Sequence, residues 1–359
     1  MVGVKKWYNF DGHKLIYHMD RIYDHFRDGK RIDPLHIDIG TTKACNAKCA
    51  YCYGIFQKMS GDIMPREALM DVFGTAAGLG VKSITVTGDG EPTLNPSMYE
   101  AVILGKSKGL DIGFATNGIA LNMNKSRILL DSCVWIRFNL SAVNQKSYLN
   151  IHGVDEWDRV LKNIEEMVQI RSVFGIDCTI GFQMVLTPEA LDDVIPEAKL
   201  AIGLGVDYFV IKQFSDPACD EMSRFGLDWY DKPEIIEVLK AAELLSNDVT
   251  KIVPKYDMIH SKGIRQYDRC VDCALLFQIS GSSKCYPCGY LFGNDRYCYG
   301  DLKQNTLKEI LDSEQYWSVV KHMREEFDVH TQCKGNCRHD FTNKFIWDYL
   351  HQPQHLNFI

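Results

Sequence analysis

Short apolar runs alternate with longer amphipathic segments from about residue 35 onward, and this alternation constrains the fold more than any other feature. It is typical of repeated βα units, in which helices connect parallel strands and pack on the sheet. The expected strands are rich in Ile, Val, Phe and Tyr, which favour extended structure. These strands are Leu35 to Ile39, Ser83 to Thr87, Asp111 to Thr116, Val134 to Ser141, Thr179 to Val185 and Tyr208 to Lys212.

Helices are expected between these strands, and several of them end in glycine, which commonly stops a helix. They are Glu67 to Ala77, Ser97 to Lys108, Lys125 to Asp131, Trp157 to Phe174, Pro188 to Gly203 and Pro233 to Leu245. The pattern predicts an α/β fold, a partial (βα)6 TIM-like barrel with a small cysteine-rich C-terminal extension. Right-handed crossovers place the carboxyl ends of all strands on one rim, where we expect the chemistry.

Three regions are expected along the 359 residues, because single cores seldom grow past about 250 to 300 residues. Residues 1–34 form an N-terminal helical extension, with one amphipathic helix at roughly His13 to Arg27, packed on the barrel. Residues 35–250 form the barrel, and residues 251–359 form the cysteine-rich extension.

The chain has thirteen cysteines, and its N-terminus lacks the apolar run of a signal peptide. Because disulfides are typical of exported proteins, these cysteines indicate metal binding or redox chemistry instead. We therefore expect a reducing, cytoplasmic setting. No stretch reaches about 18 consecutive apolar residues, so no membrane partner is expected. The formal net charge of -7 argues against a broad basic surface and leaves a nucleic-acid partner unsupported, although a local basic patch could survive the average.

Cys45, Cys49 and Cys52 follow the first expected strand with the spacing C-x3-C-x2-C. Three thiolates on one tight loop can hold three irons of a cubane cluster and leave the fourth iron open to a substrate or cofactor. Zinc is the alternative, but structural zinc takes four ligands and no fourth cysteine or histidine follows on this loop.

With Tyr51 before its third cysteine, this loop resembles the signature of the radical S-adenosylmethionine (SAM) superfamily. The resemblance implies a [4Fe–4S] cluster on the three cysteines, SAM on the open iron, and an external electron donor of flavodoxin or ferredoxin type. It also implies cleavage of SAM to methionine and a 5′-deoxyadenosyl radical, which then abstracts hydrogen from a substrate.

Residues at successive strand ends extend the resemblance. Segment 87–92 reads Thr-Gly-Asp-Gly-Glu-Pro and is similar to the family's Gly-Gly-Glu element with one residue inserted. A tight turn at the glycines, a turn cap at Asn117 and a helix start at Ser141 are the plain structural alternatives. The resemblance implies that SAM is bound by Tyr51, Gly88, Gly90, Glu91, Asn117 and Ser141.

Polar residues inside the last two expected strands indicate a lined pocket, because burying them without partners is costly. Gln183 is expected among the cofactor-binding residues, and Lys212 and Gln213 are candidate catalytic residues. Cys219, in the following loop, is a third candidate, with an inert thiol as the alternative. A one-residue error in strand phase would invert the face on which these side chains lie.

The second cysteine group lies between Cys270 and Cys337. Residues 279–288 read Ile-Ser-Gly-Ser-Ser-Lys-Cys-Tyr-Pro-Cys and resemble the hairpin that carries auxiliary-cluster ligands in SPASM and Twitch extensions of radical SAM enzymes. The full two-cluster pattern is absent, so we expect one auxiliary [4Fe–4S] cluster. Structural zinc is the alternative, because two C-x2-C pairs also fit a zinc ribbon. The expected ligands are Cys270, Cys288, Cys333 and Cys337, with Cys273 and Cys285 as alternates.

These resemblances imply a radical SAM enzyme that oxidises, epimerises or rearranges a small-molecule or nucleotide-derived substrate. A maturase of ribosomal peptides is an alternative, although residues 1–34 are too few for a leader-binding module. An isomerase acting on an amino-acid-modified nucleobase in DNA is another. A non-catalytic iron–sulfur or zinc protein is an alternative from a different functional class. The motifs at successive strand ends would serve no purpose in such a protein.

Overall fold

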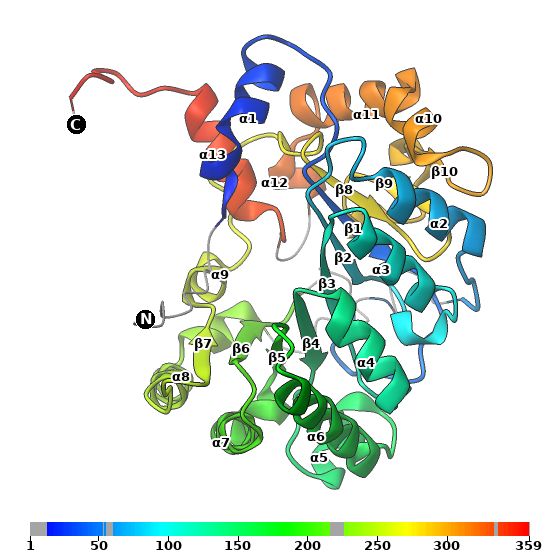
Figure 1. Ribbon diagram of the computed structural model, residues 1–359. Coiled ribbons are helices and arrows are strands. Elements are labelled where there is room, and N and C mark those ends of the chain that lie inside the picture. The colour runs from blue at the N-terminus through cyan, green and yellow to red at the C-terminus, as the bar shows by residue number, and fades with distance from the viewer. Residues whose placement is uncertain (1–12, 53, 55–59, 216–225, 334–336, 359) are drawn as a thin grey trace, which may run out of the picture.

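The computed structural model describes residues 13–52, 54, 60–215, 226–333 and 337–358. Within these residues, ten strands form one sheet in the order β10-β9-β8-β1-β2-β3-β4-β5-β6-β7 (Figure 1). The strands are β1 (His36–Gly40), β2 (Ser83–Thr87), β3 (Asp111–Thr116), β4 (Trp135–Asn139), β5 (Thr179–Leu186), β6 (Tyr208–Gln213), β7 (Lys251–Pro254), β8 (Leu276–Ile279), β9 (Lys284–Tyr286) and β10 (Gly300–Asp301).

Strands β8 and β1 to β7 all run parallel, and β9 and β10 are antiparallel to their neighbours. Each strand expected from the sequence is present within two residues of its expected bounds, so the partial barrel is confirmed. The sequence missed β7 and the parallel pairing of β8 with β1. Both strands come from the range assigned to the extension, and the predicted domain boundaries remain a prediction.

Helices cover the outer face of the curved sheet (Figure 1). The α-helices are α1 (Met19–Phe26), α2 (Arg66–Thr75), α3 (Met98–Ser107), α4 (Met123–Ser132), α5 (Gln145–His152), α6 (Trp157–Phe174), α7 (Val194–Leu204), α8 (Pro233–Glu243), α9 (Tyr256–Ser261), α10 (Leu307–Asp312), α11 (Glu314–Glu325), α12 (Val329–Gln332) and α13 (Asp340–Leu350). The short 3-10 helices are η1 (Leu15–His18), η3 (Pro92–Leu94), η4 (Pro188–Asp193), η5 (Leu227–Asp231), η6 (Gly289–Leu291) and η7 (Asp295–Tyr297).

The two faces of the sheet differ in chemistry because side chains alternate along a strand. On β4, Ile136 and Phe138 are fully buried in the core shared with the outer helices. The residues that alternate with them, Arg137 and Asn139, therefore face the interior of the barrel and are only half-buried. This polar inner face lies below the carboxyl-end rim.

The N-terminal helix α1 packs against the C-terminal helix α13. Leu15 and Ile22 form a small core with Leu35, Leu275 and Ile346. This contact ties the N-terminal extension to the C-terminal segment and to the residues just before β1 and β8. Across the described ranges, no helix is long and apolar enough to cross a membrane.

Candidate metal and cofactor site

The loop that carries Cys45, Cys49 and Cys52 leaves the carboxyl end of β1 and docks on the C-terminal end of α5. The amides of Lys48 and Ala50 donate to the carbonyls of His152 and Ile151, at 2.9 and 2.8 Å. Gly153 follows in the left-handed conformation, with φ of 70°, and a Cβ there would lie 2.7 Å from the Lys48 carbonyl oxygen. The close approach of the two segments therefore requires glycine at this position.

The imidazole of His152 contacts the sulfur of Cys49. Its Nδ1 lies 3.2 Å from the Cys49 Sγ, and its Nε2 accepts the amide N–H of Ser141 at 3.2 Å. Burial lowers the pKa of His152 to about 3, so the ring is neutral and carries one N–H. Because Nε2 is the acceptor, Nδ1 holds the proton and donates it to the sulfur.

Two further N–H groups point at Cys45. The amide of Ala47 donates to the Cys45 Sγ at 3.5 Å, and the Asn117 Nδ2 lies 4.0 Å from the same sulfur. Burial raises the pKa of the Cys45 thiol to about 11 and that of Cys49 further still. Burial therefore disfavours free thiolates at these positions, and metal cations would supply the positive charge that stabilises them. The N–H donors around the sulfurs also stabilise anionic sulfur. The residues fit a cluster with one open iron.

Glu91 links the ends of β2 and β3. Its Oε1 accepts hydrogen bonds from the Thr93 amide and hydroxyl and from the Thr116 hydroxyl, at 3.1, 2.7 and 2.7 Å. Its Oε2 accepts one, from the Asn117 amide at 2.8 Å, which leaves this oxygen able to accept another. Burial raises the pKa of Glu91. A cationic amine at Oε2 would stabilise the ionised carboxylate.

Asp89, the residue between the two glycines of segment 87–92, connects the end of β2 to the hairpin formed by β8 and β9. Asp89 accepts hydrogen bonds from the Ser280 hydroxyl at 2.7 Å and from the Gly281 amide at 2.9 Å. At Gly90 a Cβ would lie 2.3 Å from the Thr42 carbonyl oxygen, so this turn must approach the cluster loop closely. Sequence reasoning gave Asp89 no role.

The other expected SAM-binding residues surround the same loop. Asn117 donates to the Asn46 side chain at 2.7 Å, and Tyr51 packs edge-on against His152 with centroids 5.8 Å apart. Ser141 is fully buried, and its hydroxyl accepts the Val185 amide at 3.1 Å. Gly88 has φ of 124° and adjoins Gly40. Contact of these residues with SAM stays a prediction.

The polar residues of β5 and β6 lie on different faces. Gln183 faces the interior and donates to the Asn139 Oδ1 at 3.1 Å. Lys212 also lies on the inner face. The next residue, Gln213, points to the outer face together with Phe209 and Ile211 and is fully buried. Their catalytic roles stay predictions. Cys219 lies outside the described residues.

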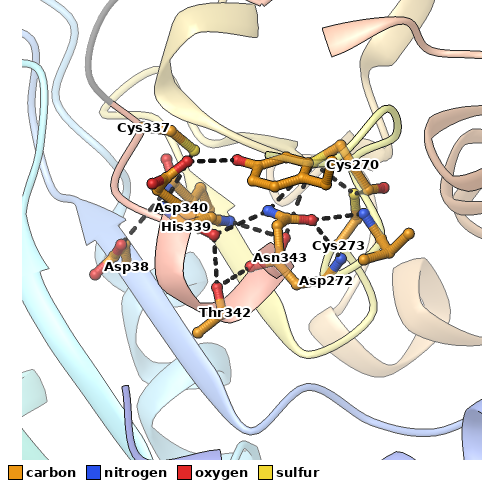
Figure 2. A network of polar contacts seen from close by, with 12 residues as sticks. Asp38, Cys270, Asp272, Cys273, Cys337, His339, Asp340, Thr342 and Asn343 are labelled. Atoms are coloured by element: carbon orange, nitrogen blue, oxygen red, sulfur yellow. Dashed lines mark hydrogen bonds and ion pairs between the residues drawn. The ribbon is translucent and has the colours of Figure 1, made fainter. Parts of the chain in front are cut away.

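The C-terminal segment gathers a second group of cysteines (Figure 2). The sulfurs of Cys270 and Cys273 are 3.6 Å apart. In addition to burial, Cys270 and Cys333 raise the pKa of the Cys288 thiol, and Cys333 and Cys270 raise the pKa of the Cys337 thiol. Cys333 also acts on Cys270, so these four thiols lie within electrostatic range of one another. The structure therefore brings the four expected ligands together with the alternate Cys273.

The other alternate, Cys285, lies elsewhere. It is fully buried on β9, and the thiol of Cys298 and the carboxylate of Asp301 raise its pKa, in addition to burial. Around the group that contains Cys270 and Cys333, the Asn343 Nδ2 lies 3.9 Å from the Cys270 Sγ, and the Arg265 guanidinium lies 3.8 Å from the Cys333 Sγ. These donors suit anionic sulfur, so the residues fit a cluster there as well.

A chain of hydrogen bonds runs from this cysteine group to the inner face of the barrel (Figure 2). Asp272, beside Cys273, contacts the His339 Nδ1 at 3.2 Å, and the His339 Nε2 contacts the Gln278 amide at 3.0 Å. Gln278 then donates to Asp38 on β1 at 3.2 Å. Sequence reasoning missed this network, because its members are single polar residues without a motif.

A cluster loop at the rim of an open βα barrel, followed by a second cysteine group, defines a class of iron–sulfur protein. Residues 39–201 match the radical SAM superfamily, and residues 275–338 match SPASM, an iron–sulfur cluster-binding domain. The chain therefore belongs to the radical SAM superfamily and carries a SPASM-type domain.

Curated relatives match up to half of this chain. A probable GTP 3′,8-cyclase of Saccharolobus solfataricus is 30% identical over 182 residues, which cover 50% of this chain and 56% of the relative. A probable GTP 3′,8-cyclase of Pyrococcus abyssi is 28% identical over 144 residues, 40% of this chain and 46% of the relative. The match spans about half the length of these relatives.

Solved structures share the fold over most of the chain. SuiB of Streptococcus suis bound to SAM aligns with a TM-score of 0.64 at 16% identity, covering 85% of this chain and 71% of SuiB. The protein anSMEcpe with bound SAM aligns with a TM-score of 0.60 at 17% identity, covering 90% of this chain and 98% of anSMEcpe. At such identities the likeness shows the fold alone.

Proposed function

We propose that this protein cleaves SAM reductively and uses the resulting radical to abstract hydrogen from a substrate held on the inner face of the barrel. The observation that carries the proposal is the convergence of the cysteine loop, Glu91 and Asn117 at the carboxyl-end rim. A bound [4Fe–4S] cluster supplies the electron that splits SAM into methionine and a 5′-deoxyadenosyl radical.

The residues of the chain bind and orient the cofactors. Cys45, Cys49 and Cys52 hold the cluster, and the N–H groups of His152 and Ala47 stabilise the negative charge on its sulfurs. Packing of the loop on α5 fixes the position of those sulfurs relative to the rim.

SAM is held on the side of the rim formed by β2 and β3. The Glu91 Oε2 is the acceptor for its methionine amine, because Oε1 is already occupied by Thr93 and Thr116. Asn117 contacts both Glu91 and the cluster loop and so sets the distance between the amine site and the cluster. Tyr51, Ser141 and Gln183 complete the proposed SAM-binding set.

One auxiliary cluster is held by Cys270, Cys288, Cys333 and Cys337, with Cys273 as a possible substitute. Such a cluster can accept an electron from a substrate radical or ligate the substrate. We assign a small-molecule or nucleotide-derived substrate and an external flavodoxin- or ferredoxin-type donor. The relatives named as GTP 3′,8-cyclases support a nucleotide-derived substrate.

The test is anaerobic reconstitution with iron and sulfide, metal analysis, and an assay for 5′-deoxyadenosine after addition of SAM and dithionite. The wild-type chain should hold about eight irons and form 5′-deoxyadenosine, because two cubane clusters carry four irons each. Cys49→Ala should abolish the product and remain folded. Cys178→Ala, at a buried cysteine on the outer side of the barrel, should retain it. Bound zinc without SAM cleavage would contradict the proposal.

A further inference from the structure

Two cationic side chains lie on the inner face of the barrel. On β4, Arg137 alternates with Ile136 and Phe138, and on β6 Lys212 follows Ile211, which is fully buried on the outer face. Strand β5 separates the two, so the strands that carry them are about 10 Å apart, two inter-strand spacings. The register pairs Arg137 with Gly181 and Gly181 with Tyr208, so Lys212 lies four residues, or about 13 Å, nearer the carboxyl-end rim than Arg137. The charge of Arg137 still acts on Lys212, so the two long side chains approach one another inside the barrel.

Among the residues that the structure describes, neither cation has an ion-pair partner. The Arg137 Nε is buried without a hydrogen-bond partner among them, and the guanidinium lies 5.4 Å from the centroid of the Trp135 ring. Asp38 and Tyr208 lie within electrostatic range of Arg137. Within the described residues, Lys212 forms no hydrogen bond or ion pair. Burial, together with the charges of Arg137, Lys255 and Arg338, lowers the pKa of Lys212 to about 7. Unpaired buried cations are costly to folding and are retained mainly where a ligand needs them.

Two further cations lie near this pair among the described residues. Arg338 and Lys255 lie within electrostatic range of Lys212. The carboxylate on this face, Asp38, is already engaged, since it pairs with Arg338 at 2.8 Å and His36 at 3.0 Å and accepts from Gln278. Although burial opposes its ionisation, Arg338 and His36 hold the pKa of Asp38 at about 2. A chain with a formal net charge of -7 thus concentrates positive charge here.

Aromatic rings occupy the deep end of the inner face, toward the start of the strands. A Cβ at Gly113 would lie 2.1 Å from the Trp135 ring, and a Cβ at Gly181 would lie 2.2 Å from the Tyr208 ring. Each ring therefore lies over a glycine of a neighbouring strand. Arg137 lies two residues nearer the rim than Trp135 and level with Tyr208, and Lys212 lies nearer the rim than both rings.

We propose that Arg137 and Lys212 form an oxyanion site that holds a phosphate or carboxylate group of the substrate. Arginine and lysine recognise such groups through charge-assisted hydrogen bonds, and the planar guanidinium can form two at once. Anchoring the anionic end between Arg137 and Lys212, inside the barrel, leaves the opposite end of the substrate free to reach the proposed SAM site at the rim. The inference rests on the proposed function and adds the charge class of the substrate.

The experiment measures anion binding to the reconstituted holoenzyme with SAM, by anaerobic calorimetric titration with pyrophosphate and, separately, with succinate. The variants are Arg137→Met and Lys212→Met, which keep an apolar stem of similar length. The matched control is Lys199→Met, on the exposed surface of α7. Thermal unfolding is recorded for each protein. SAM cleavage by the wild type, without either probe, tests the proposed function independently.

We expect saturable binding of at least one probe, weakened by about tenfold or more in each interior variant and unchanged in Lys199→Met, since each lost charge-assisted contact is worth at least that factor. Pyrophosphate binding alone identifies a phosphate-bearing substrate, and succinate binding alone identifies a carboxylate. The Tm of the interior variants should stay equal or rise, because an unpaired buried charge is removed. Absence of binding by both probes, equal binding in the variants, or a large fall in Tm would each overturn the oxyanion site.

Discussion

Replacing His152 with phenylalanine separates two functions of this residue. The substitution removes the ring N–H at Cys49 and the ring nitrogen that accepts the Ser141 amide. It keeps an aromatic ring that can stack on Tyr148, whose centroid lies 4.4 Å from that of His152 at an interplanar angle of 25°. The variant therefore removes hydrogen bonds and preserves most of the packing.

The expected effect on the cluster is a lower reduction potential. An N–H group directed at a ligand sulfur stabilises the more negative, reduced cluster and so raises its potential. A one-electron potential changes by about 59 mV for each factor of ten, or ~1.4 kcal/mol. If the hydrogen bond is stronger in the reduced state by about 1 kcal/mol, His152→Phe lowers the potential by about 40 mV.

The expected effect on folding has a different origin. The buried Ser141 amide loses its acceptor, which should lower the free energy of unfolding by about 1 to 3 kcal/mol. His152→Asn is the matched variant, because its side-chain amide can donate from near the position of Nδ1. It should restore part of the potential.

The assay is a redox titration of the reconstituted protein followed by electron paramagnetic resonance, with the iron content of each variant matched. Urea unfolding of the same proteins gives the stability. Equal potentials in wild type and His152→Phe would refute the role of the hydrogen bond. Equal potentials in the phenylalanine and asparagine variants, both below that of the wild type, would show that an N–H donor near the position of Nδ1 does not restore the potential.

Three further predictions concern other parts of the chain. Cys288→Ala should remove about four irons per chain, whereas Cys298→Ala, beside Cys285, should keep them in the same metal analysis. Asp89→Asn should lower the free energy of unfolding in urea by about 1 to 3 kcal/mol through its lost bonds to the hairpin, and exposed Asp111→Asn should not. Burial and Asp193 raise the pKa of Glu197, whose carboxylate oxygens have no hydrogen-bond partner. The folded state then holds a proton that the unfolded state releases above about pH 4.5, so wild-type stability falls as pH rises, by up to about 1.4 kcal/mol per pH unit. Glu197→Gln should therefore gain more in Tm over wild type at pH 8 than at pH 5, and a pH-independent difference would contradict this assignment.

The auxiliary-cluster assignment depends on how the structure divides two neighbouring cysteines. Cys285 and Cys288 are separated by two residues and belong to one C-x2-C pair, yet Cys288 lies within electrostatic range of Cys270 and Cys333 while Cys285 lies beside Cys298. The antiparallel pairing of β9 with β8 and β10 separates them, since Cys285 is inside β9 and Cys288 is beyond its end.

The sequence alone determined the features that depend on local patterns. Alternating apolar runs defined the six barrel strands, because strand and helix periodicity are properties of neighbouring residues. The spacing of Cys45, Cys49 and Cys52 defined the cluster loop for the same reason, since three ligands on one short loop need no distant partner. The helix-stopping glycine Gly175 marked the end of α6, whereas α7 continues one residue past the expected Gly203, to Leu204.

Only the tertiary structure decided which distant side chains meet. The contact of His152 with Cys49 joins residues 103 positions apart, and that of Asp89 with Ser280 joins residues 191 apart. Lys212 faces into the barrel and Gln213 faces away from it. Which of the two faces inward depends on the exact alternation along the strand, and a one-residue shift would exchange them. Such contacts arise from the pairing of strands and the packing of helices, so single polar residues without a repeated pattern gave no signal of them before the chain was folded.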